Sequence, residues 1–331
     1  MHWSLVSASG FQEEIVSSDL VLRHHQTLRQ PQIPLTEHER YSRLFSTLTL
    51  GDMSDRLEIT RTTWNNFAVR FTETANKRMT LQCAQHLHSH MQLDCAQNVL
   101  EVAAGAGLGS LDIAQYLLED CSKLPQDSKR TFTVTDLSPV MIDMAEKNLS
   151  GVCSDIVAIT CREANGQDLS DIATGSIDRY VASLCLQLTP DPDALLREAS
   201  RVLTADGMAG FTIWGSPDQS GNFVISTAAN KELGFDENVT EHPNFIMGKD
   251  IPALRQRFLK AGFKRVQLWP FQCVVELWSG EEFAKFQEKM MCLEDKELQT
   301  KRFAVIKRMA DDWLAKGTPI GLETYIILAR K

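Results

Sequence analysis

Short apolar runs alternate with segments of helical periodicity from residue 98 onward. The apolar runs predict strands, at 98–103, 131–136, 156–160, 177–184, 208–214, 266–271 and 324–329. The periodic segments predict helices, at 108–119, 139–149, 192–203, 252–261, 280–291 and 296–316. Strands that alternate with helices form a parallel sheet with right-handed crossovers. The pattern therefore predicts an α/β fold with a doubly wound, mostly parallel sheet.

The rest of the chain shows other patterns. Between 60 and 93, large apolar side chains recur at helical spacing and predict helices, as at Met79, Cys83, Leu87 and Met91. Residues 1–52 carry no long periodic pattern, and we expect a disordered N-terminal extension there, followed by one domain over 53–331. The segment 215–248 contains Pro217, Gly221 and Pro243 and is expected to be a loop.

The most informative motif follows the first predicted strand. A small-residue turn with glycines at 105, 107 and 109 opens directly into a helix. Glycine lets the backbone turn tightly and lets a ligand approach closely, and the helix N-terminus presents unpaired N–H groups. Glu101 stands just before the turn, where a carboxylate would repel a pyrophosphate and attract an ammonium or sulfonium group. The motif therefore points away from a dinucleotide.

A second motif ends the strand predicted at 131–136. Asp136 is the last residue of this strand, and Ser138 and Pro139 then begin a helix as N-cap and first-turn residue. An acid at the end of the second strand of a nucleotide-binding α/β unit is placed to accept both hydroxyl groups of a ribose. Together with the glycine turn, Asp136 indicates an adenosyl ligand at the carboxyl edge of the sheet.

The order of these motifs resembles class I S-adenosylmethionine-dependent methyltransferases, in the small-molecule group that includes the ubiquinone/menaquinone C-methyltransferases. Residues 99–114 resemble the first family motif, and 132–149 resemble the second, with Asp136, Ser138, Met141 and Ala145 in register. Later segments resemble later motifs, at 164–169, 176–178, 186–192 and 197–203. The resemblance covers about residues 60–330. It implies a Rossmann-like methyltransferase fold of seven strands, the last of them antiparallel.

The resemblance also implies S-adenosylmethionine as cofactor and the residues that hold it. Glu101 would lie near the methionine ammonium group, Asp136 would hold the ribose, and Asn165 would bond the adenine amino group. The other expected cofactor residues are Ala103, Gly105, Gly107, Leu137, Met141, Gly166 and Ser183. Two positions depart from the family pattern. Ala103 replaces a glycine, which is tolerable where φ is negative, and Asn165 replaces an aspartate, which keeps an acceptor oxygen but loses the charge.

The same resemblance places an acceptor pocket between an N-terminal cap at 60–93 and a helical lid insertion at 278–317. We expect its lining to include Trp64, Phe71, Gln187, Trp214 and Met290. Their character indicates a small, apolar or aromatic metabolite as the methyl acceptor. Because a sulfonium is already an activated leaving group, such enzymes need proximity, alignment and a dry pocket more than a fixed catalytic residue. The sequence therefore names no catalytic residue.

Two alternatives stay open at this point. The pattern Gly105-x-Gly107-x-x-Ser110 partly mimics the fingerprint of an NAD(P)-dependent reductase, although its third glycine is absent. A non-catalytic relative that binds the cofactor or a partner protein would carry the same motifs. Thermal stabilisation by S-adenosylhomocysteine but not by NADH would separate the methyltransferase from the reductase.

Composition narrows the partners and the location. The 34 basic and 43 acidic residues give a net charge of −9, and no basic run appears, which disfavours a nucleic-acid substrate. No apolar run reaches about 18 residues, the length that indicates a membrane span. Eight cysteines without a Cys-x-x-Cys pair favour reduced thiols, so we expect a cytoplasmic protein. Acidic residues within 1–52 argue against an organelle-targeting peptide.

Three histidines, at 86, 88 and 90, raise the question of a metal site. His86 and His90 lie one helical turn apart, which suits a shared metal ion. No carboxylate or cysteine ligand accompanies them, and Leu87 and Met91 define the apolar face, which leaves the histidines largely on the polar face. We therefore expect no metal.

We predict that deletion of residues 1–52 leaves both the melting temperature and cofactor affinity nearly unchanged, because this segment lacks the periodicity of packed elements. Differential scanning calorimetry of the full chain and of the truncated chain measures the effect. A drop of several degrees in melting temperature would show that the segment packs on the domain.

Overall fold

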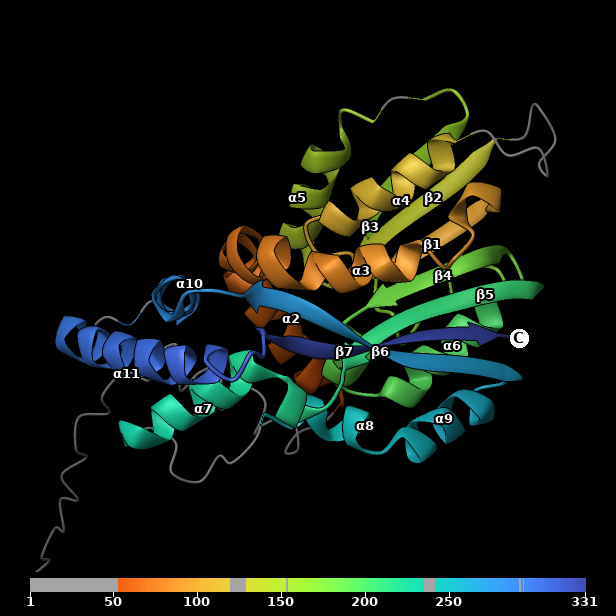
Figure 1. Ribbon diagram of the computed structural model, residues 1–331. Coiled ribbons are helices and arrows are strands. Elements are labelled where there is room, and N and C mark those ends of the chain that lie inside the picture. Colours follow the sequence, from red (N-terminus) through yellow and green to blue (C-terminus); the bar gives the residue numbers. More distant parts are fainter. Residues whose placement is uncertain (1–52, 120–128, 153, 235–241, 292, 294) are drawn as a thin grey trace, which may run out of the picture. The chain divides into compact units, whose positions relative to one another are not determined.

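The computed structural model describes residues 53–119, 129–152, 154–234, 242–291, 293 and 295–331, so the expected extension at 1–52 lies outside the described residues. A seven-stranded sheet in the order β3-β2-β1-β4-β5-β7-β6 forms the centre, with β7 antiparallel to its neighbours (Figure 1). The strands are β1 (Asn98–Val102), β2 (Arg130–Asp136), β3 (Val157–Glu163), β4 (Ile177–Ser183), β5 (Leu203–Trp214), β6 (Arg265–Glu276) and β7 (Ile320–Arg330). The predicted doubly wound sheet with an antiparallel last strand is confirmed.

Helices cover both faces of the sheet. One face carries α3 (Leu81–His88), α4 (Leu108–Leu118) and α5 (Pro139–Leu149), and the other carries α6 (Pro192–Val202), α8 (Ile246–Lys249) and α9 (Ile251–Lys260). Figure 1 shows a further group beyond the edge where β4 ends: α2 (Met53–Phe71), α7 (Gly221–Glu232), α10 (Gly280–Met291) and α11 (Lys296–Leu314). Short helical segments join them: η1 (Thr72–Thr80), η2 (Leu93–Cys95), η3 (Leu186–Leu188), η4 (Pro217–Gln219) and η5 (Pro243–Phe245).

Side-chain caps explain why several helices begin where the sequence predicts. Ser138 Oγ accepts a hydrogen bond from the Met141 N–H at 3.1 Å, and Pro139 fills the first turn of α5. Asp250 caps α9 in the same way. Ser279 Oγ accepts from the Glu282 N–H at 3.2 Å. These local bonds set the helix starts independently of packing.

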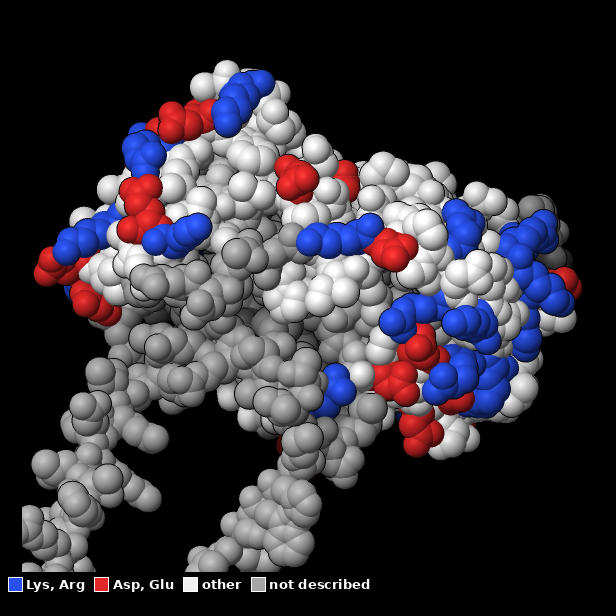
Figure 2. Space-filling model, turned by 90° about the horizontal axis from the view of Figure 1, so that it is seen from below, with Lys and Arg blue, Asp and Glu red and all other residues white. Residues whose placement is uncertain are grey.

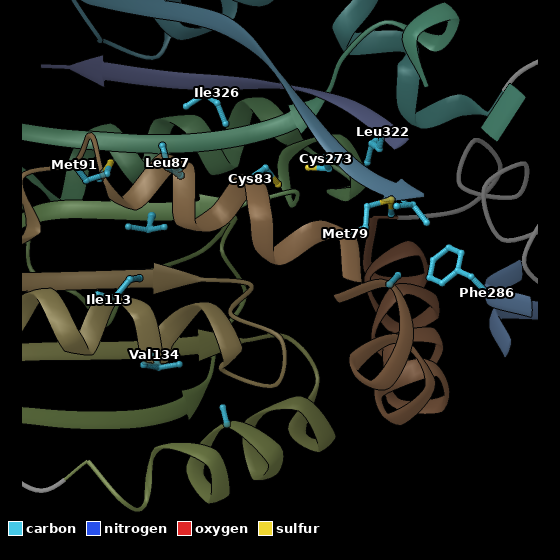
Figure 3. Close-up of a cluster of buried hydrophobic side chains, with 14 of the residues drawn as sticks. Met79, Cys83, Leu87, Met91, Ile113, Val134, Cys273, Phe286, Leu322 and Ile326 are labelled. Carbon is cyan, nitrogen blue, oxygen red and sulfur yellow. The ribbon is translucent and has the colours of Figure 1, made fainter. Parts of the chain in front are cut away.

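Two apolar cores lie on opposite faces of the sheet. The larger core includes a stripe along η1, α3 and the turn that follows α3, in which every side chain is at most 4% exposed (Figure 3): Met79, Cys83, Leu87 and Met91. Gly210 in β5 allows the stripe to approach the sheet, because a Cβ there would lie 2.2 Å from the Met91 Sδ. The helical pattern predicted at 60–93 is therefore the face that anchors this segment to the sheet.

Two elements differ from the prediction. The expected loop at 215–248 contains the 12-residue helix α7, which buries Ile225 and Ala229. Apolar and polar residues do not alternate along α7 with a clear helical period. The prediction of a loop therefore followed from the proline and glycine residues of the segment. Residues Thr72–Thr80 form a π-helix between two α-helices. The sequence indicates a helix there but not its type, because the hydrogen-bond register of a π-helix depends on surrounding contacts.

Charged side chains form mixed surfaces. On the face shown in Figure 2, Lys and Arg gather toward the right-hand side, with Asp and Glu among them. The Arg257 Nη1 of α9, for example, lies 2.8 Å from the Asp193 Oδ1 of α6. Within the described residues, no helix has the length and apolar character needed to cross a membrane. The expected cytoplasmic location stays a prediction.

We predict that Leu87→Ala lowers the free energy of unfolding by about 2–5 kcal/mol, because Leu87 is fully buried and the smaller side chain leaves a cavity. Leu259→Ala is the matched control, since Leu259 is also helical but 40% exposed. We expect this control to change stability by less than about 0.5 kcal/mol. Urea unfolding measures both, and equal losses would contradict the packing described for α3.

Candidate active site

A cavity opens at the carboxyl edge of the sheet. Side chains of α2, η1 and α3 form one wall, and the ends of β1, β2 and β4 with the segment after β3 form the other. Nine of the ten residues predicted to hold a cofactor line it: Glu101, Ala103, Gly105, Asp136, Leu137, Met141, Asn165, Gly166 and Ser183. Gly107 does not line it. This glycine has φ +76°, and a Cβ would lie 3.0 Å from the Ala145 Cα, so it serves the packing of α4 on α5.

Asp136 joins the two turns at the centre of the cavity. Its Oδ2 accepts from the Gly105 N–H at 2.9 Å and its Oδ1 accepts from the Ser138 N–H at 2.8 Å. The residue is 8% exposed. Burial raises the pKa of Asp136 to about 6, although the N–H groups of Ser138 and Gly105 lower it. Each carboxylate oxygen accepts one backbone bond and keeps a lone pair for a ligand hydroxyl.

Glu101 is buried deeper, at the end of β1. It is 4% exposed, and its Oε2 accepts from the Ser110 Oγ at 2.5 Å. Burial raises the pKa of Glu101 to about 8, the hydrogen bond from Ser110 lowers it, and the nearby carboxyl groups of Asp136 and Asp112 raise it. A buried carboxyl group without a cation holds its proton, and a cationic ligand group beside it would favour the ionised form.

Backbone strain gathers at this cavity. Ala103 has φ +57° and Leu184 has φ +51°, and both line it. The expectation of a negative φ at Ala103 is therefore wrong: the turn after β1 needs the left-handed region although the residue carries a Cβ. Such a conformation costs about 1–2 kcal/mol per non-glycine residue. Strained residues of this kind are typical of ligand sites whose surroundings fix the backbone.

Asn165 and Gln167 form a small polar unit after β3. The Asn165 Oδ1 accepts from the Gln167 N–H at 3.1 Å and from the Gln167 Nε2 at 3.0 Å. The Gln167 Oε1 in turn accepts from the Asp191 N–H at 2.6 Å. An adenine amino group at Asn165 would therefore have to share this oxygen with Gln167, a cavity residue that the sequence motifs did not single out.

The predicted acceptor residues separate into two groups. Trp64 and Phe71 line the cavity, with ring centroids 5.2 Å apart in an edge-to-face arrangement. Gln187, Trp214 and Met290 do not line it, which corrects the prediction for these three.

Each of the three has another partner. The Gln187 Nε2 donates to the Leu184 carbonyl at 3.2 Å. Trp214 packs on Phe223 of α7, with ring centroids 4.1 Å apart. The Thr74 Oγ1 donates to the Met290 Sδ at 2.8 Å. No described residue of 278–317 lines the cavity, so the insertion packs behind η1 at this point.

The three histidines occupy different environments. His88 is 1% exposed, which corrects its expected place on the polar face, and its Nδ1 lies 2.7 Å from the Asp112 Oδ2. The His86 ring stacks on Phe271, with centroids 4.4 Å apart. Among the described residues, no three His, Cys, Asp or Glu side chains come together as a metal-binding group.

Asn76, Thr80 and Ala84 line the cavity although the sequence motifs did not identify them. They recur every fourth residue, beside the apolar stripe that begins at Met79. A second periodic stripe next to the core stripe was the available signal. Whether such a stripe faces solvent or a cavity depends on the neighbouring chain, which the periodicity does not show.

Comparisons with known proteins agree with this geometry. Residues 100–211 match the family model of a methyltransferase domain. A highly reducing polyketide synthase, easB, from Emericella nidulans is 27% identical over 214 residues, which cover 62% of this chain. The chain spans only 8% of the length of that synthase.

The fold is shared with a solved structure, that of YcgJ. The YcgJ protein of Bacillus subtilis is 13% identical, covers 76% of this chain and 99% of its own, and superposes with a TM-score of 0.50. A chain from the complex between the Haloferax volcanii Trm112 methyltransferase activator and a methyltransferase is 14% identical, covers 82% of this chain and 96% of its own, and has a TM-score of 0.49.

The glycine turn, the end of β1 and the strands β2, β3 and β4 lie within the region, residues 100–211, that matches a methyltransferase domain. S-adenosylmethionine, the cofactor that the sequence predicts, carries a cationic sulfonium and a cationic ammonium group. The buried Glu101 would ionise beside such a cation, whereas beside a pyrophosphate it would keep its proton and form no ion pair. The narrower likeness to the ubiquinone/menaquinone enzymes stays a prediction.

We predict that the free energy of unfolding of the ligand-free protein falls as pH rises between about 6 and about 8. In this range the folded state keeps the Glu101 proton, while the unfolded chain, with a pKa near 4.5, has released it. The folded state thus binds more protons, so each pH unit costs up to about 1.4 kcal/mol. The Asp136 contribution has the same sign but is complete near pH 6.

Glu101→Gln tests this prediction by urea unfolding across the pH range. We expect a shallower decline than in the wild type, and Glu146→Gln, at an exposed position on α5, should keep the wild-type slope. Identical slopes in all three proteins would show that Glu101 is already ionised in the folded state.

Proposed function

We propose that the protein transfers the methyl group of S-adenosylmethionine to a small, apolar acceptor bound beside Trp64 and Phe71. The observation that carries this proposal is one cavity with two unlike parts. Its floor holds two buried carboxyl groups, Glu101 and Asp136, and its other wall presents aromatic and aliphatic side chains. The first part suits a cationic nucleoside ligand, and the second suits an apolar acceptor.

The cofactor would lie along the ends of β1 and β2. Asp136 would accept hydrogen bonds from the ribose hydroxyl groups through the lone pairs that its backbone bonds leave free. Leu137 and Met141 would pack on the adenine. Glu101 would ionise beside the methionine ammonium group, because an opposite charge lowers the pKa of a buried carboxyl group.

The chain promotes the reaction by position and environment. S-adenosylmethionine supplies an activated methyl group on a sulfonium. Trp64 and Phe71 line the cavity, where they would exclude water from the bound substrates, and aromatic ring faces attract a neighbouring cation. The rigid turns at Ala103 and Leu184 hold the floor in one geometry, which lowers the entropy cost of aligning donor and acceptor.

The polyketide synthase relative supports an apolar acceptor of the polyketide class. The match covers only 8% of the length of that synthase, so the likeness concerns one domain of it and not the whole enzyme. Incubation with methyl-labelled S-adenosylmethionine and metabolite extracts would identify the product that gains the label.

Cofactor binding gives the direct test. We predict that Asp136→Ala weakens S-adenosylhomocysteine binding by about 10- to 1,000-fold, because hydrogen bonds to a charged group contribute about 1.5–3 kcal/mol each. Calorimetric titration measures the dissociation constant. Asp143→Ala removes an exposed acid from α5 and should bind like the wild type.

Circular dichroism would confirm that both variants are folded, since Asp136 also holds two backbone N–H groups. Unchanged affinity in folded Asp136→Ala would refute the assignment of this residue. Wild-type binding of NADH in place of S-adenosylhomocysteine would refute the proposed function.

A further inference from the structure

The wall of the cavity formed by η1 and α3 carries a row of small and polar side chains. Asn76, Thr80 and Ala84 follow one another at four-residue intervals, and all three line the cavity. The next residue in the row, His88, is paired with Asp112. Ala84 lies near Glu101, because a Cβ added to Gly109 would contact both the Glu101 Oε1, at 3.5 Å, and the Ala84 Cβ, at 3.8 Å. The row therefore runs from the region of Glu101 toward the end of the cavity that holds Trp64 and Phe71.

Asn76 has half of its hydrogen-bonding capacity unused. The Thr80 Oγ1 donates to the Asn76 Oδ1 at 3.2 Å, so the amide oxygen has a partner and the Nδ2 is turned away from it. Among the described residues, no group accepts a bond from this Nδ2, although the side chain is only 8% exposed. Because Asn76 lines the cavity and its Nδ2 makes no bond to another described residue, this donor is available to an acceptor atom of a ligand.

Contacts outside the cavity hold the π-helix in place. The Arg78 Nε donates to the Val275 carbonyl at 3.0 Å, and its Nη2 lies 2.7 Å from the Glu276 Oε2. Met79 is buried in the core beside them (Figure 3). These anchors all belong to β6 or to the core, so the position of Asn76 does not depend on what fills the cavity. π-Helices are rare and occur frequently at functional sites.

The charge of the cavity restricts the ligand group. Glu101 and Asp136 are the acidic residues that line it, and no Lys, Arg or His contributes to the described lining. A carboxylate or phosphate on the acceptor would therefore find no cationic side chain to pair with in the described lining. Phe71 and Leu81, which flank Asn76 and Thr80 in the chain, make the surroundings apolar. A neutral oxygen on an otherwise apolar molecule satisfies all of these conditions.

We propose that Asn76 binds a carbonyl oxygen of the methyl acceptor through its side-chain Nδ2, and that the acceptor is a neutral, predominantly apolar carbonyl compound. Thr80 is the positioning residue, because its hydroxyl fixes which end of the amide faces the cavity. This assignment rests on the proposed methyl transfer and adds the chemical class of the acceptor to it.

Acetophenone and ethylbenzene test the assignment, since the pair differs by one carbonyl oxygen. With S-adenosylhomocysteine present at saturation, ligand-observed NMR titration measures the affinity of each probe. We expect Asn76→Leu to lower the ratio of acetophenone to ethylbenzene affinity by about 3- to 10-fold, as one lost neutral hydrogen bond requires. Asn76→Asp keeps the shape but cannot donate, and should lower the ratio in the same direction.

Two variants check the role of the helix itself. Thr80→Val should lower the ratio by a smaller factor, because the amide is then free to rotate. Thr74→Val changes a residue of the same π-helix that does not line the cavity and should keep the wild-type ratio. An unchanged ratio in both Asn76 variants, or no saturable binding of acetophenone to the wild type, would overturn the assignment.

A control titration with S-adenosylhomocysteine distinguishes cofactor binding from the role of Asn76 in acceptor binding. S-adenosylhomocysteine affinity should be the same, within about twofold, in the wild type and in every variant at 74, 76 and 80. Failure of the wild-type protein to bind S-adenosylhomocysteine would refute the proposed function. Intact cofactor binding with an unchanged probe ratio would refute only the role of Asn76.

Discussion

The carboxylate of Asp136 is the interaction on which the cavity depends. It accepts one backbone N–H from the turn after β1 and one from the turn after β2, so two turns that are far apart in the sequence share one anchor. Burying this group without a cation is costly, as its raised pKa of about 6 shows. The fold sustains this cost because the same two oxygens remain available to a ligand, which can supply the missing hydrogen bonds.

The neighbouring features follow the same principle. Glu101 is buried with a pKa raised to about 8, and Ala103 and Leu184 adopt left-handed backbone conformations that their side chains disfavour. None of these features stabilises the ligand-free protein. All of them lie at the carboxyl edge of a sheet whose two faces are covered by well-packed cores. The packed cores thus maintain an edge that is unfavourable alone and complementary to a cationic ligand.

The sequence predicted those parts whose signal is local. The start of α5 depends on a cap at Ser138 and a proline at 139, so its bounds are evident from residues near the helix. The strand ends that carry Glu101 and Asp136 were likewise evident, because a glycine turn follows the first strand and a cap with a proline follows the second. By contrast, Trp214 and Met290 were assigned to the cavity from their type and approximate place. Their true partners, Phe223 and Thr74, belong to elements whose packing no local pattern encodes.

Asn76 shows how one segment can serve two roles. On η1 and α3, Met79, Cys83 and Leu87 fill the core, while the row from Asn76 to Ala84 faces the cavity. Because both rows belong to the same rigid element, core packing that fixes the segment also fixes the amide that points into the cavity. A hydrogen-bond donor held in this way loses little conformational entropy when a ligand binds, so its full preference for an oxygen is expressed as selectivity. A flexible loop with the same asparagine would lose much of that preference to the cost of ordering.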